Sequence, residues 1–152
     1  MRHPAIRPAL FLIALLADAG GAAASQLPGP MTAHVERVID GDTIRVRVQV
    51  WIDQELAVNV RLRGVDAPEL RARCDDERSR AEAARDFVIA LVGEQITLHS
   101  IGRDKFFGRV VADVTVADGR DLGEALLAAG HARPYDGGRR ESWCGERAKA
   151  SP

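Results

Sequence analysis

The chain has 152 residues, of which 46% are hydrophobic, and its 21 basic and 22 acidic residues give a formal net charge of −1 at pH 7. This length suits one domain with a single core, and the hydrophobic content excludes a disordered chain. The near-neutral charge excludes a protein that binds nucleic acid through a strongly basic surface, so any attraction to phosphate must come from a local cluster.

The first 24 residues have the pattern of a secretory signal peptide. Arg2 and Arg7 give a positive start, residues 9–17 are apolar, and the small residues 22–24 offer a cleavage site. The apolar run is too short to span a bilayer. We therefore expect a secreted or periplasmic protein without stable membrane association after cleavage; the alternative is an uncleaved anchor or a lipid-associated tail.

The next part of the chain predicts a linker and three strands. Residues 25–33 contain Pro and Gly and predict a linker, and the folded domain is expected over 34–136, with a C-terminal tail over 137–152. A first strand begins at His34, and Asp40-Gly41 is a turn dipeptide. Apolar residues then alternate with polar ones along two further strands, and those predicted to face inward are Ile44, Val46, Val48, Val50, Val58, Val60 and Leu62. Arg61 and Arg63 are predicted to lie on the solvated face of the third strand.

Two helices and two more strands follow. Acidic residues 75–77 suit the first turn of a helix, which continues with a core-facing stripe and ends at Gly93. Strands are predicted around 96–100 and over 110–116. Asp121 can cap a second, short helix that ends at Gly130.

This order of elements predicts a mainly β protein with helices (α+β). Five short strands, with a helix after the third and a short helix after the fifth, suit a five-stranded barrel of the oligonucleotide-binding (OB) type whose loops carry the site. A split open sheet with helices on one face is the alternative, since element order alone does not separate the two.

The two cysteines, Cys74 and Cys144, favour a disulfide in an exported protein. The bond would close a loop of about 70 residues, which is worth roughly 4 kcal/mol in the chain-entropy model. It would also pin the tail to the start of the first helix. The alternative is a metal pair, but two thiols with no adjacent histidine make a poor zinc site.

Three acidic and basic clusters carry the predicted chemistry. Asp42 and Asp66 each lie at the edge of a predicted strand. Two neighbouring carboxylates repel unless a cation or a proton lies between them. Oxygen ligands without histidine favour calcium or magnesium. Ala67 precedes a proline, which favours an extended backbone that can direct its carbonyl at the ion.

The same clusters offer a base and two phosphate clamps. Glu69 can take a proton from an attacking water. Arg61 and Arg109 offer bidentate forks for the negative charge that develops during phosphodiester cleavage. Each motif alone is typical of an ordinary turn or a solvated strand, so the functional interpretation depends on their joint occurrence at strand ends.

These stretches resemble the staphylococcal nuclease (thermonuclease) family over about residues 35–135. The matching segments are Val38 to Thr43, Arg61 to Glu69, Phe107-Gly108-Arg109, Asp118-Gly119 and Glu124-Ala125-Leu126. The resemblance implies an OB-fold barrel, a Ca²⁺ cofactor and endonucleolytic hydrolysis of DNA and RNA that leaves 3′-phosphate ends. It also implies a monomer with weak sequence preference.

The resemblance assigns roles to individual residues. Asp42, Asp66 and the carbonyl of Ala67 match metal ligands, whereas Glu69 matches the general base. Arg61 and Arg109 match the phosphate-binding arginines of the catalytic set. The expected substrate-binding residues are Lys105, Phe107 and Tyr135, of which Phe107 and Tyr135 are candidates for stacking on bases.

The sequence departs from the family pattern at several positions. Ala67 replaces a threonine, Phe107 replaces a tyrosine with Phe106 as an extra residue before it, and Arg71 and Arg73 stand where a lysine-rich loop is expected. A different class of function also stays open, namely a catalytically inactive OB-fold module that binds nucleic acid or protein.

Overall fold

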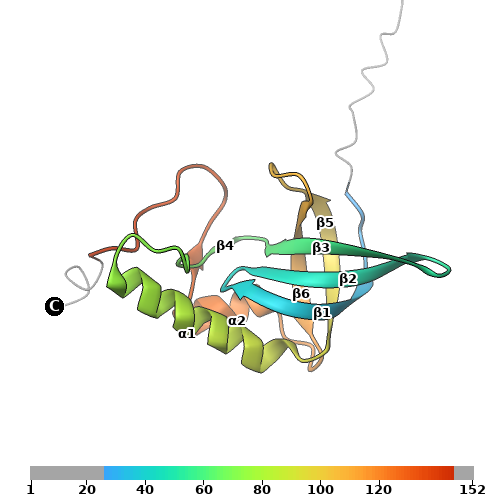
Figure 1. The fold of residues 1–152 in the computed structure, drawn as a ribbon, viewed down its shortest axis with the longest axis horizontal. Helices are drawn as coiled ribbons and strands as arrows, with labels where there is room; N and C mark the ends of the chain where they lie inside the picture. Colours follow the sequence, from blue (N-terminus) through green and yellow to red (C-terminus); the bar gives the residue numbers. More distant parts are fainter. Residues whose placement is uncertain (1–25, 146–152) are drawn as a thin grey trace, which may run out of the picture.

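The computed structural model describes residues 26–145 of the chain (Figure 1). The expected signal peptide therefore lies outside the described residues. Within them, no helix combines the length and the apolar character needed to cross a membrane.

Five strands of the described chain form a closed barrel. They are β1 (Met31–Asp40), β2 (Thr43–Trp51), β3 (Gln54–Leu62), β5 (Gln95–Arg103) and β6 (Arg109–Val116). The order around the barrel is β1-β2-β3-β6-β5, and β1 closes it by pairing with β5. Every pairing is antiparallel except the one between β3 and β6, which is parallel. This closed topology confirms the OB-type barrel and excludes the split open sheet.

The inward alternation of the second and third strands is confirmed with two exceptions. The core of the barrel contains the expected residues of β2 and β3, which are Ile44, Val46, Val48, Val58, Val60 and Leu62. The prediction that Val50 faces inward is wrong, because Val50 is 48% exposed near the tip of the β2–β3 hairpin, which projects beyond the barrel (Figure 1). The prediction that Arg61 is solvated is also wrong, because only 7% of its surface is exposed. Arg63 is confirmed on the outer face, where it pairs with Asp113.

β1 begins at Met31, earlier than the expected start at His34. The residues before it are also hydrogen-bonded, since Leu27 exchanges two backbone hydrogen bonds of 2.8 Å with Ile101 of β5. The part of the predicted linker that the structure describes is therefore held against the barrel.

Two helices in residues 26–145 lie on one side of the barrel (Figure 1). The first, α1 (Asp75–Val92), contacts β1, and the second, α2 (Leu122–Ala128), contacts β6 and α1. The inner face of α1 is buried and includes Ala81, Ala84 and Val88. The predicted cap of α2 is confirmed, because the Asp121 carboxylate accepts a hydrogen bond of 2.9 Å from the Glu124 amide.

A short pair of strands links the end of β3 to the C-terminal part of the chain. β4 (Val65–Asp66) pairs antiparallel with β7 (Arg133–Pro134), which places Asp66 opposite Arg133. Neither strand was predicted. Each has two residues, which is too short for an alternating pattern.

The C-terminal segment returns to the start of α1, as expected. Cys74 and Cys144 form a disulfide with a Cα–Cα distance of 6.0 Å, and Trp143 is buried. The two sulfurs are bonded to each other, so the alternative of a metal held by two thiolates does not apply. In Figure 1 this segment lies at the end of the molecule opposite the β2–β3 hairpin.

Candidate functional site

The turn between β1 and β2 forms one wall of the site. The Asp42 amide donates to the Asp40 carboxylate at 3.2 Å, and the Thr43 hydroxyl donates to Asp42 Oδ1 at 2.9 Å. Gly41 permits the helix to approach this turn closely, because a Cβ there would lie 2.7 Å from the Ala84 Cβ. Asp42 is consequently buried and fixed, with 2% of its surface exposed.

Arg61 is placed beside Asp42 by the register of the barrel. The β2–β3 pairing sets Arg61 opposite Thr43, and Arg61 Nη1 lies 2.6 Å from Asp42 Oδ2. Its Nη2 donates to the Val65 carbonyl at 3.0 Å and lies 4.0 Å from Asp66 Oδ1. This pairing explains why an arginine on a strand is buried: its charge is balanced by the two aspartates.

Asp66 is oriented by two residues of the C-terminal segment. Its Oδ2 accepts hydrogen bonds from Arg133 Nε and Nη2 at 3.1 and 3.0 Å, and from the Trp143 indole at 3.3 Å. Its Oδ1 is buried and has no hydrogen-bond partner of good geometry, although two guanidiniums lie near it. Asp66 therefore holds one poorly satisfied oxygen near the guanidiniums of Arg140 and Arg61, at 2.9 and 4.0 Å respectively.

Arg140 completes the cluster from the C-terminal segment. Its Nε lies 2.9 Å from Asp66 Oδ1, its Nη2 lies 3.7 Å from Asp42 Oδ2, and its Nη1 donates to Glu69 Oε1. Burial opposes the charge, but the hydrogen bond to Glu69 and the two aspartates outweigh it and raise the pKa of Arg140. One guanidinium thus contacts all three predicted carboxylates.

The loop after β4 brings Ala67 and Glu69 to the same place. The Ala67 amide donates to Asp42 Oδ2 at 3.2 Å, so Ala67 lies directly beside the aspartates. Glu69 is more accessible, with 46% of its side chain exposed. A partly exposed carboxylate next to buried ones has the access to water that a base requires.

Asp40 adds a further acidic group at the edge of the cluster. Burial, with repulsion from Asp42, raises the pKa of Asp40 to about 7. Asp40 therefore holds its proton up to near neutral pH, mainly because a buried carboxylate is poorly solvated.

Arg109 faces the same groove but does not reach the carboxylates in this structure. The parallel pairing of β3 and β6 sets Arg109 opposite Asn59, on the strand next to Arg61. Its Nε lies 2.5 Å from Asp104 Oδ2, and its guanidinium carbon lies 4.6 Å from the centre of the Phe106 ring. Asp104 is correspondingly acidic: burial opposes this effect, but the hydrogen bond from Arg109 lowers the pKa of Asp104.

A groove of about 900 Å³ extends along this face from Arg61, Glu69 and Arg140. Its basic lining residues are Arg61, Arg63, Arg103, Lys105, Arg109 and Arg140, and its acidic ones are Glu69, Asp104 and Asp136. The groove is therefore locally positive although the whole chain is not. This groove is the kind of local basic cluster that a near-neutral chain needs if it is to attract phosphate.

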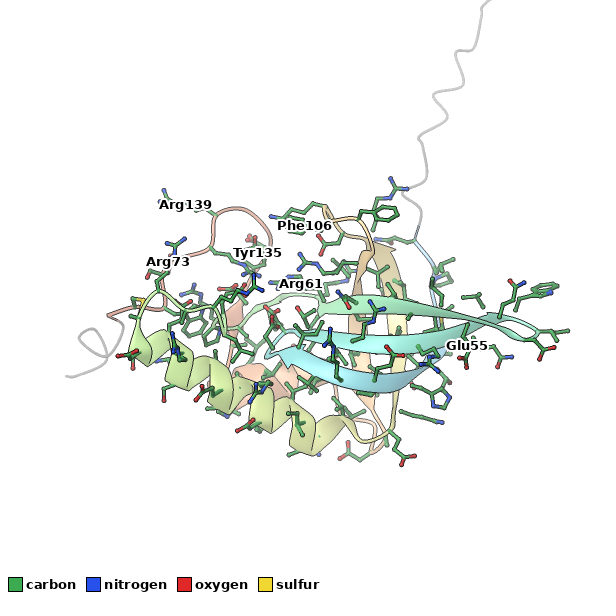
Figure 2. All side chains as sticks on the ribbon, viewed as in Figure 1. Glu55, Arg61, Arg73, Phe106, Tyr135 and Arg139 are labelled. Atoms are coloured by element: carbon green, nitrogen blue, oxygen red, sulfur yellow. A yellow bond between two sulfur atoms is a disulfide. The ribbon has the colours of Figure 1, made fainter. Side chains whose placement is uncertain are left out.

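The predicted substrate-binding residues divide into two groups. Lys105 and Tyr135 line the groove, and the Tyr135 ring centre lies 5.8 Å from the Arg61 guanidinium carbon. Phe107 is fully exposed and does not line it, whereas its neighbour Phe106 does. Figure 2 shows Phe106, Tyr135 and Arg61 around the same opening.

The carboxylates fit a hard divalent cation. The donors are oxygens, Asp42 and Asp66 both approach the guanidiniums of Arg61 and Arg140, and the buried Oδ1 of Asp66 lacks a good hydrogen bond. Oxygen ligands of this kind suit Ca²⁺ or Mg²⁺. The cluster of Cys74, Glu77 and Cys144 is not a rival site, since its sulfurs form the disulfide.

Three contributors to the cluster were not predicted from the sequence, namely Arg133, Arg140 and the indole of Trp143. They belong to a segment without hydrophobic periodicity, so no local pattern of residues marks their contacts with Asp66. The predicted disulfide was the available signal, because a bond from Cys144 to Cys74 returns the preceding residues to the neighbourhood of Asp66.

The fold and this cluster define a class: a small OB-type β-barrel with arginines and carboxylates gathered at one end. Comparison with known proteins refines the class. The family model described as "Staphylococcal nuclease homologue" matches residues 59–149. The chain belongs to the staphylococcal nuclease family.

Two curated relatives agree with this membership. Each is described as an "Uncharacterized endonuclease", one from Escherichia coli and one from Escherichia coli O157:H7. Each is 33% identical to this chain over 104 residues, which cover 68% of this chain and 60% of the relative.

Proposed function

We propose that the protein is an exported, monomeric, calcium-dependent endonuclease that hydrolyses phosphodiester bonds of DNA and RNA and leaves 3′-phosphate ends. The observation that carries the proposal is that Arg61 and Arg140 gather Asp42, Asp66 and Glu69 at one end of a cation-lined groove. Family membership and the description of both relatives as endonucleases also support nuclease activity.

The metal ligands in this proposal are Asp42, Asp66 and the carbonyl of Ala67. A bound Ca²⁺ would supply Lewis-acid stabilisation of charge on the phosphate oxygens. The chain's own contribution is to hold the aspartates in place: Thr43 and Arg61 fix Asp42, while Arg133 and Trp143 fix Asp66.

Glu69 and the two arginines perform the remaining chemistry. Glu69 takes a proton from a water whose oxygen forms a bond to phosphorus as the bond to the 5′ oxygen breaks. The 5′ oxygen leaves with a proton from solvent, and the phosphate stays on the 3′ oxygen. Arg61 and Arg109 stabilise the negative charge on the phosphoryl oxygens. Arg109 reaches the phosphate by breaking its ion pair with Asp104 and binding a phosphate oxygen in its place.

The groove accounts for substrates of both kinds. Its guanidiniums bind phosphate, which DNA and RNA share, and contacts to phosphate carry no base sequence. Lys105 adds a further cation, Tyr135 offers a ring in the groove, and Phe107 offers an exposed ring outside it for unpaired bases.

Incubation of plasmid DNA and of RNA with the purified protein tests this proposal, with Ca²⁺ in one arm and a chelator in the other. We expect both substrates to be degraded with Ca²⁺ and preserved with the chelator. Treatment of the products with a 3′-phosphatase should expose new 3′ hydroxyls. Folded protein that cleaves nothing at any Ca²⁺ concentration would leave the inactive binding module instead.

Export is supported by the pattern of residues 1–24 and by the Cys74–Cys144 disulfide, because such bonds persist in oxidising compartments. Mass spectrometry of protein from the periplasm and the medium should find a chain that starts at Ser25. Uncleaved protein confined to the cytosol would contradict this part of the proposal.

A further inference from the structure

Arg140 occupies the space between the carboxylates that are proposed to bind the metal. It contacts Asp66 Oδ1 at 2.9 Å, approaches Asp42 Oδ2 to 3.7 Å, and donates to Glu69. Asp66 Oδ1 is also the buried oxygen that lacks a hydrogen bond of good geometry. The guanidinium is therefore near this oxygen without satisfying it.

Several contacts hold the segment that carries Arg140 over the site. We name residues 135–144 the strap. At its start, the Tyr135 amide donates to the Gly64 carbonyl at 2.8 Å, and further along Arg133 Nη2 donates to the Glu141 carbonyl at 2.5 Å. At its end, the buried Trp143 fixes it to Asp66 of β4, and the disulfide of Cys144 fixes it to the start of α1.

The strap divides the space around the carboxylates. Arg140 and Glu69 line the groove of about 900 Å³ and also a second pocket of about 330 Å³ on the side of Asp66, Arg71 and Arg73. Withdrawal of the Arg140 side chain would join these two spaces at the position of the aspartates.

The charges explain why such a residue matters for metal binding. Asp42, Asp66 and Glu69 carry three negative charges, and the guanidiniums of Arg61, Arg133 and Arg140 balance them. A divalent ion bound to both aspartates would lie within a few ångströms of Arg140, and like charges at that distance repel strongly outside bulk water. Arg61 and Arg133 are further constrained by backbone carbonyls, whereas the Arg140 contacts that are described are to carboxylates.

We propose that Arg140 is a built-in cation that occupies the carboxylate site and that a divalent ion must displace in order to bind. The disulfide-tethered strap keeps Arg140 at a high local concentration, so the protein has a lower metal affinity than its carboxylates alone would give. This inference rests on the proposed function, because it takes Asp42 and Asp66 as the metal ligands.

Calcium titration calorimetry without nucleic acid tests the inference, with Arg140→Gln and a matched control, Arg139→Gln. Arg139 precedes Arg140 and points away from the site (Figure 2). We expect Arg140→Gln to bind Ca²⁺ roughly tenfold more tightly, about 1.4 kcal/mol, and Arg139→Gln to match the unmodified protein within about twofold. An unchanged or weaker affinity in Arg140→Gln would overturn the inference.

A second variant tests the role of the strap. Cys74→Ser with Cys144→Ser releases the tether, and we expect Ca²⁺ affinity to rise in the same direction as in Arg140→Gln. Circular dichroism establishes that the variant is folded under the conditions used. If the released strap leaves the affinity of the folded variant unchanged, the tether does not impose the competition and that part of the inference is wrong.

The outcomes also separate this inference from the proposed function. If Asp66→Asn abolishes Ca²⁺ binding and Arg140→Gln leaves the affinity unchanged, the metal site stands and the inference about Arg140 is wrong. If Arg140→Gln binds Ca²⁺ more tightly but the protein leaves plasmid DNA intact, the inference stands and the proposed nuclease activity is wrong. Absence of Ca²⁺ binding in both the unmodified protein and Arg140→Gln removes both.

Discussion

Two arginine–carboxylate pairs in this protein have the same length and different surroundings. At the site, Arg61 Nη1 lies 2.6 Å from Asp42 Oδ2, and their side chains are 8% and 3% exposed. On the outer face of the barrel, Arg47 Nη2 lies 2.6 Å from Glu36 Oε1, and their side chains are 50% and 28% exposed. Equal distances therefore join groups whose charges are screened to very different degrees.

The difference teaches which charges carry function. A pair on the surface loses little when it breaks, because water solvates each partner. A buried pair costs desolvation energy that an apolar pair would avoid, so it is weak evidence for stability by itself. Its position between the β1–β2 turn and β3 suits the proposed function, which needs fixed charges to bind a metal ion and a phosphate.

Replacement of one glutamate in each region gives the largest expected difference. Glu69→Gln should lower turnover by about 10²- to 10⁴-fold, because it removes the proposed proton acceptor. Glu55→Gln removes a carboxylate of the surface pairs and should leave turnover unchanged. The measurement is initial cleavage rate at saturating Ca²⁺, with thermal melts to show that both variants are folded. An unchanged rate in Glu69→Gln would remove this residue from the role of base.

Replacement of the arginines compares the two pairs directly. Arg61→Gln should lower the free energy of unfolding by about 3 kcal/mol, because it leaves the buried Asp42 without its principal partner. Arg47→Gln should shift the urea midpoint very little, since its partners are solvated. Equilibrium unfolding in urea measures both. Similar shifts in the two variants would contradict the distinction that burial implies.

Asp40 provides a pH-dependent form of the same comparison. Its pKa in the folded protein is about 7, well above the ordinary value of 3.8, because of burial and the nearby Asp42. The folded state therefore holds a proton that the unfolded state releases between about pH 4 and pH 7, so stability falls as pH rises through that range.

We expect Asp40→Asn to remove this loss, with a gain on the order of 2 kcal/mol at pH 8 and little change at pH 4. Urea titrations of metal-free protein at both pH values measure it. Glu36 is a contrasting group, because the hydrogen bond from Arg47 lowers its pKa. A pH dependence identical in Asp40→Asn and the unmodified protein would show that Asp40 ionises normally.

The sequence was sufficient to predict the strands and helices of the barrel, because the information that specifies them is local. Alternation along β2 and β3, the Asp121 cap and the core-facing stripe of α1 each depend on residues a few positions apart. The motifs at Asp42 and Asp66 were also recognisable, and the strand order brings them together. The expectation that a disulfide links Cys74 to Cys144 is confirmed by the structure.

The sequence was insufficient where a side chain's surroundings are set by distant residues. Alternation placed Arg61 in solvent, but Asp42 and Asp66 come from other elements and permit its burial. Arg140 lies 71 positions from Glu69, with which it pairs, and no periodic pattern marks such a contact. β4 and β7 were missed for the same reason, since a pair of two-residue strands exists only through its tertiary partner.

A crystal structure of the protein with Ca²⁺ and a nucleotide bisphosphate tests the central claim most directly. The account predicts one ion at about 2.3–2.6 Å from oxygens of Asp42 and Asp66, the phosphate against Arg61 and Arg109, and Arg140 withdrawn from the carboxylates. Aspartates that remain paired with Arg140 under saturating Ca²⁺, with the ion bound elsewhere or nowhere, would contradict it.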